Sequence, residues 1–160
     1  MKTARALSLL LAMAAFPARA AEVDSAWKRL ETLVGDWEGK MDDGTVRLSY
    51  RLISGGTALL ETSNAPDSSD MVTVYHRDGE TLLLTHYCSA GNQSRLRASG
   101  LGDGALDFAF VDATNLKSPA EHRMSRLVLT LAAPDRLVQE WTSVEGGKSY
   151  TNRHEFTRKR

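Results

Sequence analysis

From Gly35 to the end of the chain, apolar and polar residues alternate with a period of two, and turn residues interrupt the alternation at regular intervals. A period of two is typical of β-strands that bury one face. Asp-Gly and Gly-Gly pairs supply the positive φ angles that tight hairpins need. The turn pairs are Asp43-Gly44, Gly55-Gly56, Asp78-Gly79, Asp103-Gly104, Pro134-Asp135 and Gly146-Gly147. This pattern predicts an all-β domain of about ten antiparallel strands, arranged as a sandwich or a barrel.

Before Gly35 the apolar residues recur with the period of an α-helix. Trp27, Leu30 and Leu33 recur at helical spacing, and Asp24 or Ser25 can cap a helix that starts just after it. The spacing predicts a short helix over residues 26–33, packed against the β-domain.

The first twenty residues have the composition of a secretory signal peptide. Lys2 and Arg5 precede an apolar run over residues 6–16, and Ala18-Arg19-Ala20 is a small-x-small cleavage site. The run is too short to span a bilayer, and no later segment is apolar enough to do so. We therefore expect residues 1–20 to be removed, and residues 21–160 to form one β-barrel domain in the periplasm or the secreted medium.

The charge of the chain limits the classes of partner that we expect, and its cysteine content excludes an internal disulfide. The chain has 20 basic and 20 acidic residues, and without the three basic residues of the leader the balance is −3. No basic stripe is present, so a nucleic-acid partner is not expected. Cys88 is the single cysteine, so no internal disulfide can stabilise the fold.

A two-residue turn fixes which residues face each other across a hairpin. With Asp43-Gly44 as the turn, Trp37 opposes Tyr50 and Lys40 opposes Arg47, a like-charge pair. With Asp78-Gly79 as the turn, Tyr75 opposes Leu82, Thr73 opposes Leu84 and Met71 opposes His86. The larger apolar residues of this second hairpin favour the face that carries His86 as the inward one. With Asp103-Gly104 as the turn, Phe110 opposes Arg97. Arg97 is then either an inward residue at the barrel mouth or a surface arginine whose stem covers Phe110.

The last hairpin, around Gly146-Gly147, places Glu145 opposite Lys148 and Glu140 opposite Arg153, two pairs of opposite charge. Its predicted inner face comprises Leu137, Gln139, Trp141, Tyr150, Asn152, His154 and Phe156. Inward amide and imidazole groups need hydrogen-bond partners, because an unpaired buried polar group costs about 1–3 kcal/mol. Either a cavity holds water or a ligand there, or these groups pair with one another in a solid core.

Reactive and hydrogen-bonding side chains are densest in residues 85–95. On a strand, His86 and Cys88 share a face, which we expect to point into the barrel. Their spacing is unfavourable for a Cys–His nucleophilic pair, and a buried, inert thiol is the commoner case. Asn92, Gln93 and Arg95 follow in a loop that either only connects two strands or holds a polar ligand group at the barrel mouth.

Several segments together resemble a family of bacterial exported lipocalin-like proteins of unknown function, distantly similar to nitrobindins and fatty-acid-binding proteins. They are Leu33-Val34-Gly35-Asp36-Trp37-Glu38-Gly39, Gly55-Gly56 with Leu59-Leu60-Glu61, residues 71–76, residues 84–93 and Gln139-Glu140-Trp141. The resemblance covers nearly all of residues 26–158. It implies a ten-stranded up-and-down calycin barrel and no settled activity. In that family Pro stands where this chain has Ser94.

We therefore expect a barrel that binds a small, mainly apolar ligand, as a monomer or weak homodimer and without a metal or other cofactor. The expected ligand-binding residues are Trp37, Tyr50, His86, Cys88, Asn92, Gln93, Arg95, Gln139, Trp141, Asn152 and His154. Three different hypotheses also stay open. They are an enzyme that uses His86 and Arg95, nitrobindin-like haem binding through His86 or His154, and an envelope interaction module with a filled core.

Overall fold

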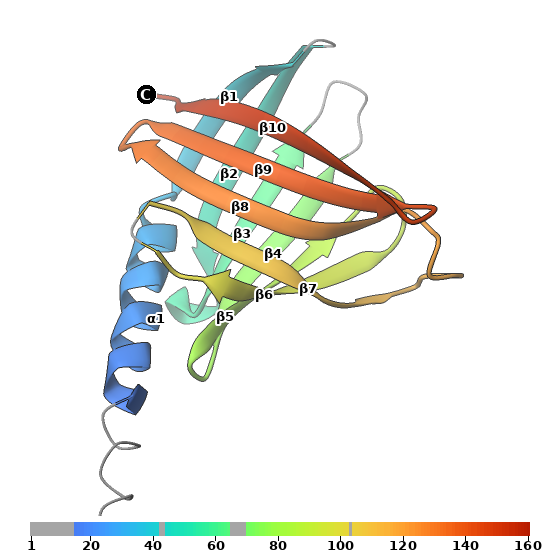
Figure 1. Ribbon diagram of the computed structural model, residues 1–160. Coiled ribbons are helices and arrows are strands. Elements are labelled where there is room, and N and C mark those ends of the chain that lie inside the picture. The colour runs from blue at the N-terminus through green and yellow to red at the C-terminus, as the bar shows by residue number, and fades with distance from the viewer. Residues whose placement is uncertain (1–14, 42–43, 65–69, 103) are drawn as a thin grey trace, which may run out of the picture.

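The computed structural model describes residues 15–41, 44–64, 70–102 and 104–160. One helix, one 3₁₀ turn and ten strands follow one another along the chain (Figure 1). Their bounds are α1 (Ala15–Glu31), β1 (Gly35–Met41), β2 (Gly44–Ile53), η1 (Ser54–Gly56), β3 (Ala58–Asn64), β4 (Met71–Asp78), β5 (Thr81–Tyr87), β6 (Gln93–Gly100), β7 (Leu106–Thr114), β8 (Arg123–Ala133), β9 (Arg136–Glu145) and β10 (Lys148–Arg158).

The ten strands form one closed antiparallel barrel in which each strand pairs with its neighbours in sequence, and β10 returns to β1. The predicted all-β, ten-stranded barrel with an N-terminal helix is confirmed. Alternate residues of each strand point inward, and buried leucines and aromatic rings fill the interior next to α1. The opposite half of the barrel is less completely filled.

The helix is longer than residues 26–33. It begins at Ala15 and ends at Glu31, so Asp24 and Ser25 lie within it and do not cap its start. Alanine has a high helix propensity, and proline is tolerated in a first helical turn, so nothing before residue 26 interrupts the helix. The face that packs on the barrel consists of Val23, Ala26, Trp27, Leu30 and, just past the helix, Leu33.

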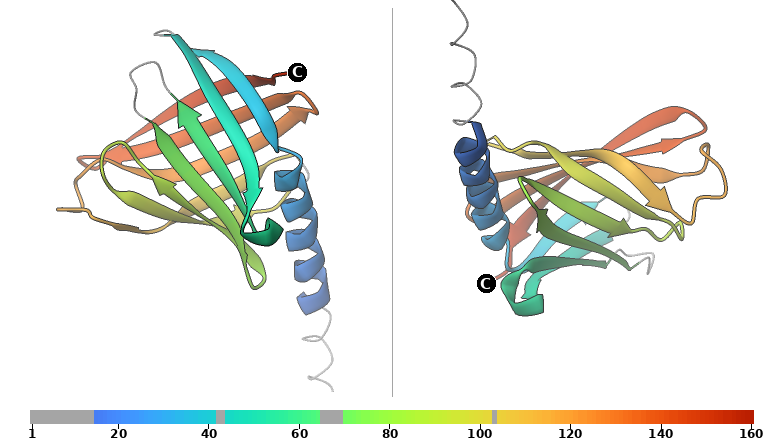
Figure 2. Two further views of the ribbon diagram at one scale, coloured as in Figure 1. Left: turned by 180° about the vertical axis from the view of Figure 1, so that it is seen from behind. Right: turned by 90° about the horizontal axis from the view of Figure 1, so that it is seen from below.

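Helix α1 lies across the end of the barrel that carries the β4–β5 and β6–β7 connections (Figures 1 and 2). Arg29 donates hydrogen bonds to the carbonyls of Leu101 and Gly102, and Arg19 donates one to the carbonyl of Glu80. The helix thereby closes this end, and the connections at the other end surround the mouth of the barrel.

Trp37 and Arg158 join the helix to the first and last strands. The Trp37 indole is fully buried and donates to the Leu33 carbonyl at 2.8 Å, and the Arg158 guanidinium lies 4.2 Å from its ring centroid. Arg158 also donates to the carbonyls of Thr32 and Val34. Carbonyls at the end of a helix have no partner within it, so these contacts satisfy groups that would otherwise be unpaired.

The close approach of β1 to β10 depends on Gly39. A Cβ atom at this position would lie 2.6 Å from the Glu155 carbonyl oxygen and 2.8 Å from the Phe156 ring. The glycine therefore permits the contact through which the barrel closes.

The registers of two predicted hairpins are wrong by two residues. In the β1–β2 ladder Trp37 faces Leu48, and Arg47 faces Glu38 at 3.5 Å, in place of the predicted like-charge pair with Lys40. The predicted Asp43-Gly44 turn falls partly outside the described residues. Because the slip is even, every side chain keeps its predicted face.

The β4–β5 ladder shows the same slip. Thr73 faces His86, and Tyr75 faces Leu84. Gly79, at a φ of 57°, and Glu80 make the turn, in place of Asp78-Gly79.

The β6–β7 hairpin and the last hairpin have opposite outcomes. In β6–β7, Leu96 faces Phe110, and Arg97 points outward to an ion pair with Asp78 at 3.2 Å, because a bulge near residue 99 shifts the register. Of the two alternatives for Arg97, the surface position is therefore the one observed, and the inward one is wrong. In the β9–β10 hairpin, Glu145 faces Lys148 and Glu140 faces Arg153, as predicted.

Candidate functional site

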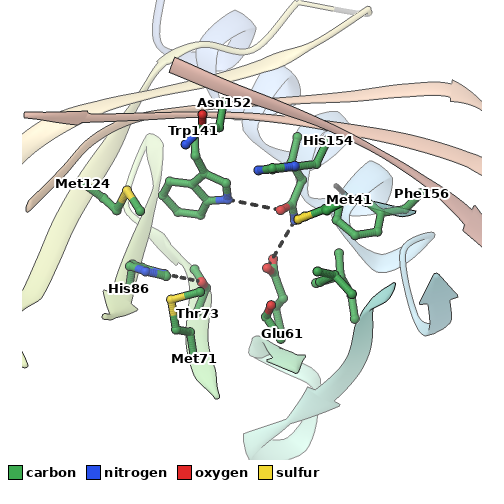
Figure 3. A pocket seen from close by; sticks show the side chains of 14 residues that line it. Met41, Glu61, Met71, Thr73, His86, Met124, Trp141, Asn152, His154 and Phe156 are labelled. Carbon is green, nitrogen blue, oxygen red and sulfur yellow. Dashed lines mark hydrogen bonds between the residues drawn. The ribbon is translucent and has the colours of Figure 1, made fainter. Parts of the chain in front are cut away.

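A cavity of about 210 Å³ occupies the half of the barrel away from α1. Most of its wall is apolar, and a few polar side chains lie among the apolar ones (Figure 3). Its lining residues are Met41, Val46, Leu48, Glu61, Ser63, Met71, Thr73, His86, Met124, Gln139, Trp141, Asn152, His154 and Phe156. They come from β1–β5 and β8–β10, so the cavity is a property of the closed barrel and not of one hairpin.

A belt of polar side chains crosses five adjacent strands at one level of the barrel. Tyr50 of β2 faces Glu61 of β3, Glu61 faces Thr73 of β4, Thr73 faces His86 of β5, and His86 faces Ser94 of β6. All five residues are buried. Register alone therefore assembles a polar wall from residues that are far apart in the sequence.

Glu61 lies at the centre of a buried hydrogen-bond network. The Tyr75 hydroxyl donates to one carboxyl oxygen at 2.7 Å, and the Gln139 amide donates to the other at 3.2 Å. The same amide nitrogen donates to the Tyr50 hydroxyl at 2.7 Å, and the Trp141 indole donates to the Gln139 amide oxygen at 3.1 Å. Burial raises the pKa of Glu61, and the hydrogen bonds it accepts oppose that rise.

His86 is the second polar feature of the wall. Its Nδ1 and the Thr73 hydroxyl are 2.9 Å apart, and its ring centroid is 4.7 Å from that of Trp141. Its Nε2 has no hydrogen-bond partner among the described residues. Burial lowers the pKa of His86 from 6.5 to about 4, so the imidazole is neutral at pH 7.

Methionine side chains supply much of the apolar wall. Met41, Met71 and Met124 come from three strands; Met71 and Met124 lie on the side of the cavity where His86 is, and Met41 lies on the side of Glu61 and Phe156 (Figure 3). Unbranched thioether side chains fill irregular volumes and adapt to different ligand shapes. The cavity wall is therefore deformable where it is apolar and fixed where it is hydrogen-bonded.

Five of the predicted site residues line the cavity: His86, Gln139, Trp141, Asn152 and His154. Trp37 and Tyr50 are fully buried and do not line it: Trp37 packs at the closed end, and Tyr50 supports Gln139 from behind the wall. Asn92 is buried, and its amide donates to the His122 carbonyl at 2.7 Å. It links the β5–β6 turn to the β7–β8 connection at the barrel mouth.

Three predicted site residues lie elsewhere. Arg95 points out of the barrel and forms a two-pronged ion pair with Asp112, because even-numbered residues of β6 face inward. Gln93 shares that outward face and accepts a hydrogen bond from Thr114. Cys88 lies beyond the end of β5, in a turn where its N–H donates to the Asn92 carbonyl, so it does not share a strand face with His86.

Glu61, Thr73 and the methionines line the cavity without having been predicted as site residues. Glu61 carries a signal in the sequence, as an acidic residue at an inward position of an apolar strand, Leu59-Leu60-Glu61. Thr73 was placed on the correct face, but the slipped register gave it Leu84 as a partner where the structure gives it His86.

The described ranges contain no group of three or more His, Cys, Asp or Glu side chains placed to bind a metal ion. No helix within them is long and apolar enough to cross a membrane. Searches of protein-family models and of curated protein sequences find no match to the chain. The interpretation of the site therefore depends on its own geometry.

Proposed function

We propose that this protein binds a small, mainly apolar ligand in the cavity of its barrel. An apolar cavity with a few convergent polar groups is the usual form of a small-molecule site. The observation that carries the proposal is His86: its side chain lines this cavity, and its buried Nε2 atom has no partner among the described residues. Buried polar atoms are nearly always hydrogen-bonded, so this atom favours an occupant with a polar group.

The cavity sets the size of that ligand. About 210 Å³ lies below the roughly 300–1,000 Å³ of sites for drug-sized molecules. A group as large as a porphyrin does not fit, which argues against haem binding through His86 or His154.

The geometry also argues against an enzyme and against an interaction module. The enzyme hypothesis requires His86 and Arg95 to act together, but they face opposite sides of the sheet. An interaction module with a filled core does not account for a cavity lined by His86, whose Nε2 has no partner among the described residues.

Narrowing the cavity tests the proposal. Ser63 lines the cavity and is only partly buried, so the phenyl ring of Ser63→Phe is expected to enter the cavity. We expect native mass spectrometry of protein from the native host to show a small bound mass, and Ser63→Phe to lose most of it. Ser149→Phe, at an exposed position, is the control and should retain the mass. Absence of any bound mass in the unaltered protein, or equal retention by Ser63→Phe, would contradict ligand binding.

We also propose that the protein is exported and that residues 1–20 are removed. The residues that α1 packs on the barrel begin at Val23, after the proposed cleavage site, and the hydrogen bonds of Arg19 involve exposed groups. We therefore expect a chain that starts at Ala21 to melt within about 2 °C of the full chain, because surface contacts contribute little. Calorimetry measures this difference, and intact mass of protein from the native host measures the cleavage. A loss of about 10 °C would show that the leader is part of the fold.

A relationship to calycins is part of the same proposal. An N-terminal helix leads into Gly35-Asp36-Trp37, and ten up-and-down strands follow and close through β1 and β10. This architecture supports the resemblance seen in the sequence and is consistent with an internal ligand site.

A further inference from the structure

The chemistry of the ligand can be inferred from Glu61, a carboxyl group that lines the cavity and is only 3% exposed. Hydrogen-bond donors on β2 and β4 and the side-chain amide of Gln139 surround this carboxyl group. Tyr75 donates to one oxygen and Gln139 to the other. Burial raises the pKa of Glu61, and hydrogen bonding by Tyr75, Tyr50 and Gln139 opposes that rise.

The orientation of Gln139 directs a hydrogen-bond donor at Glu61. The Trp141 indole can only donate, and it donates to the Gln139 amide oxygen. The amide nitrogen must then face Glu61 and Tyr50. Because that nitrogen donates to the Tyr50 hydroxyl as well, the Tyr50 proton is free to point at Glu61. A carboxylate at Glu61 can accept all of these hydrogen bonds.

All of these donors are neutral, so the charge of Glu61 is not balanced by them. Among the described lining residues, none is a lysine or an arginine. The titratable groups that face Glu61 or share its cavity are Tyr50 of β2, Tyr75 of β4, His86 of β5 and His154 of β10. His86 is neutral at pH 7, and its Nδ1 is engaged with Thr73. An ionised carboxylate has about four acceptor positions, and Tyr75 and Gln139 each occupy one, so Glu61 can accept a further hydrogen bond from a ligand.

The rest of the wall suits a positive charge with an apolar body. Trp141 and Phe156 contribute aromatic rings to the cavity. Aromatic faces attract cations, and this attraction is stronger where water is excluded. The polarisable thioethers of Met41, Met71 and Met124 complete the apolar surface.

We propose that the ligand is a small organic cation, an apolar amine whose ammonium group donates a hydrogen bond to Glu61. This inference rests on the proposed ligand-binding function and specifies its chemistry. Glu61 is the counter-ion, the aromatic rings and thioethers contact the apolar body, and Gln139, Tyr50 and Tyr75 hold the carboxylate in position.

Three probes of nearly equal shape test the proposal by calorimetry at pH 7 on the full chain. They are cyclohexylmethylamine, cyclohexylmethanol and cyclohexanecarboxylate. We expect the amine to bind at least about tenfold more tightly than the alcohol, because hydrogen bonds to charged groups are the stronger kind, and the carboxylate to bind weakest. Glu61→Gln should abolish the preference for the amine and leave the alcohol within about threefold. Glu140→Gln, on the outer face of β9, is the matched control and should change neither.

The outcomes separate the two proposals. If the alcohol binds as tightly as the amine, or if Glu61→Gln keeps the preference for the amine, a cationic ligand is excluded while ligand binding stands. If none of the three probes binds at millimolar concentration, ligand binding fails and the cationic ligand fails with it.

A second measurement applies if Glu61→Gln does not fold. Amine affinity for the unaltered protein is expected to fall as the pH is lowered, while alcohol affinity stays constant. Burial raises the pKa of Glu61, so its protonation removes the counter-ion, and protonation of His154 on the same wall acts in the same direction. An amine affinity that does not fall as the pH is lowered would overturn the inference.

Discussion

Replacement of Trp37 by alanine is expected to lower the free energy of unfolding by about 3–5 kcal/mol, the usual cost of deleting a buried aromatic side chain. Trp37 is fully buried at the closed end of the barrel. Its loss leaves a cavity, removes the hydrogen bond to the Leu33 carbonyl and removes the ring beneath the Arg158 guanidinium. Urea unfolding followed by far-UV circular dichroism measures the change, which is a large part of a typical stability of about 5–15 kcal/mol.

Two further variants show which feature of Trp37 accounts for the loss of stability. Trp37→Phe keeps an aromatic ring beneath Arg158 and loses the hydrogen bond, so it should cost about 1–2 kcal/mol. Tyr150→Ala removes an aromatic side chain that is 53% exposed and should cost no more than about 0.5 kcal/mol. If Trp37→Ala lowers the free energy of unfolding by less than about 1 kcal/mol, the contact between Trp37 and Arg158 does not hold the barrel closed.

The barrel could be predicted from the sequence because its main determinants are local. Alternation with a period of two assigns each side chain to one face, and turn residues mark where strands end. Leu82, Leu84 and His86 point inward as expected. These face assignments are correct although two predicted registers are wrong, because both registers are displaced by two residues.

Registers were harder to predict because the turn pair does not act alone. In β1–β2 the slip replaces Lys40 opposite Arg47 with Glu38 opposite Arg47. In β6–β7 a bulge near residue 99 turns Arg97 outward, and no turn residue signals it. Charge pairs between strands shift the register, and so do β-bulges. Local propensity specifies neither shift.

The site was harder to predict than the registers, because its chemistry comes from contacts between residues that are distant in the sequence. Gln139 and Glu61 are 78 positions apart, and Gln139 and Tyr50 are 89 apart. The inward face of the last hairpin correctly indicated polar groups that need partners. The partners of Gln139 lie on β2 and β3 across the barrel, where only the closed structure places them.

The pH dependence of stability should identify His86 as a buried, neutral histidine. Burial lowers its pKa from 6.5 to about 4, so the unfolded chain binds more protons than the folded protein between these values. Stability contributed by the neutral imidazole is therefore present above pH 6.5 and is lost as the pH falls toward 4. With about 1.4 kcal/mol for each pKa unit, the loss is about 3 kcal/mol.

His86→Gln isolates this loss, because Gln cannot gain a proton in this range. Between pH 7 and pH 4, the free energy of unfolding of the unaltered protein should fall by about 3 kcal/mol more than that of His86→Gln, measured by urea unfolding. Glu61 has a raised pKa and acts in the opposite direction, but it is present in both proteins and cancels in the comparison. His76→Gln, on the outward face of β4, should titrate like the unaltered protein. Parallel pH profiles for His86→Gln and the unaltered protein would mean that water reaches His86. Its Nε2 would then have water as a partner and would no longer favour a polar ligand group in the cavity.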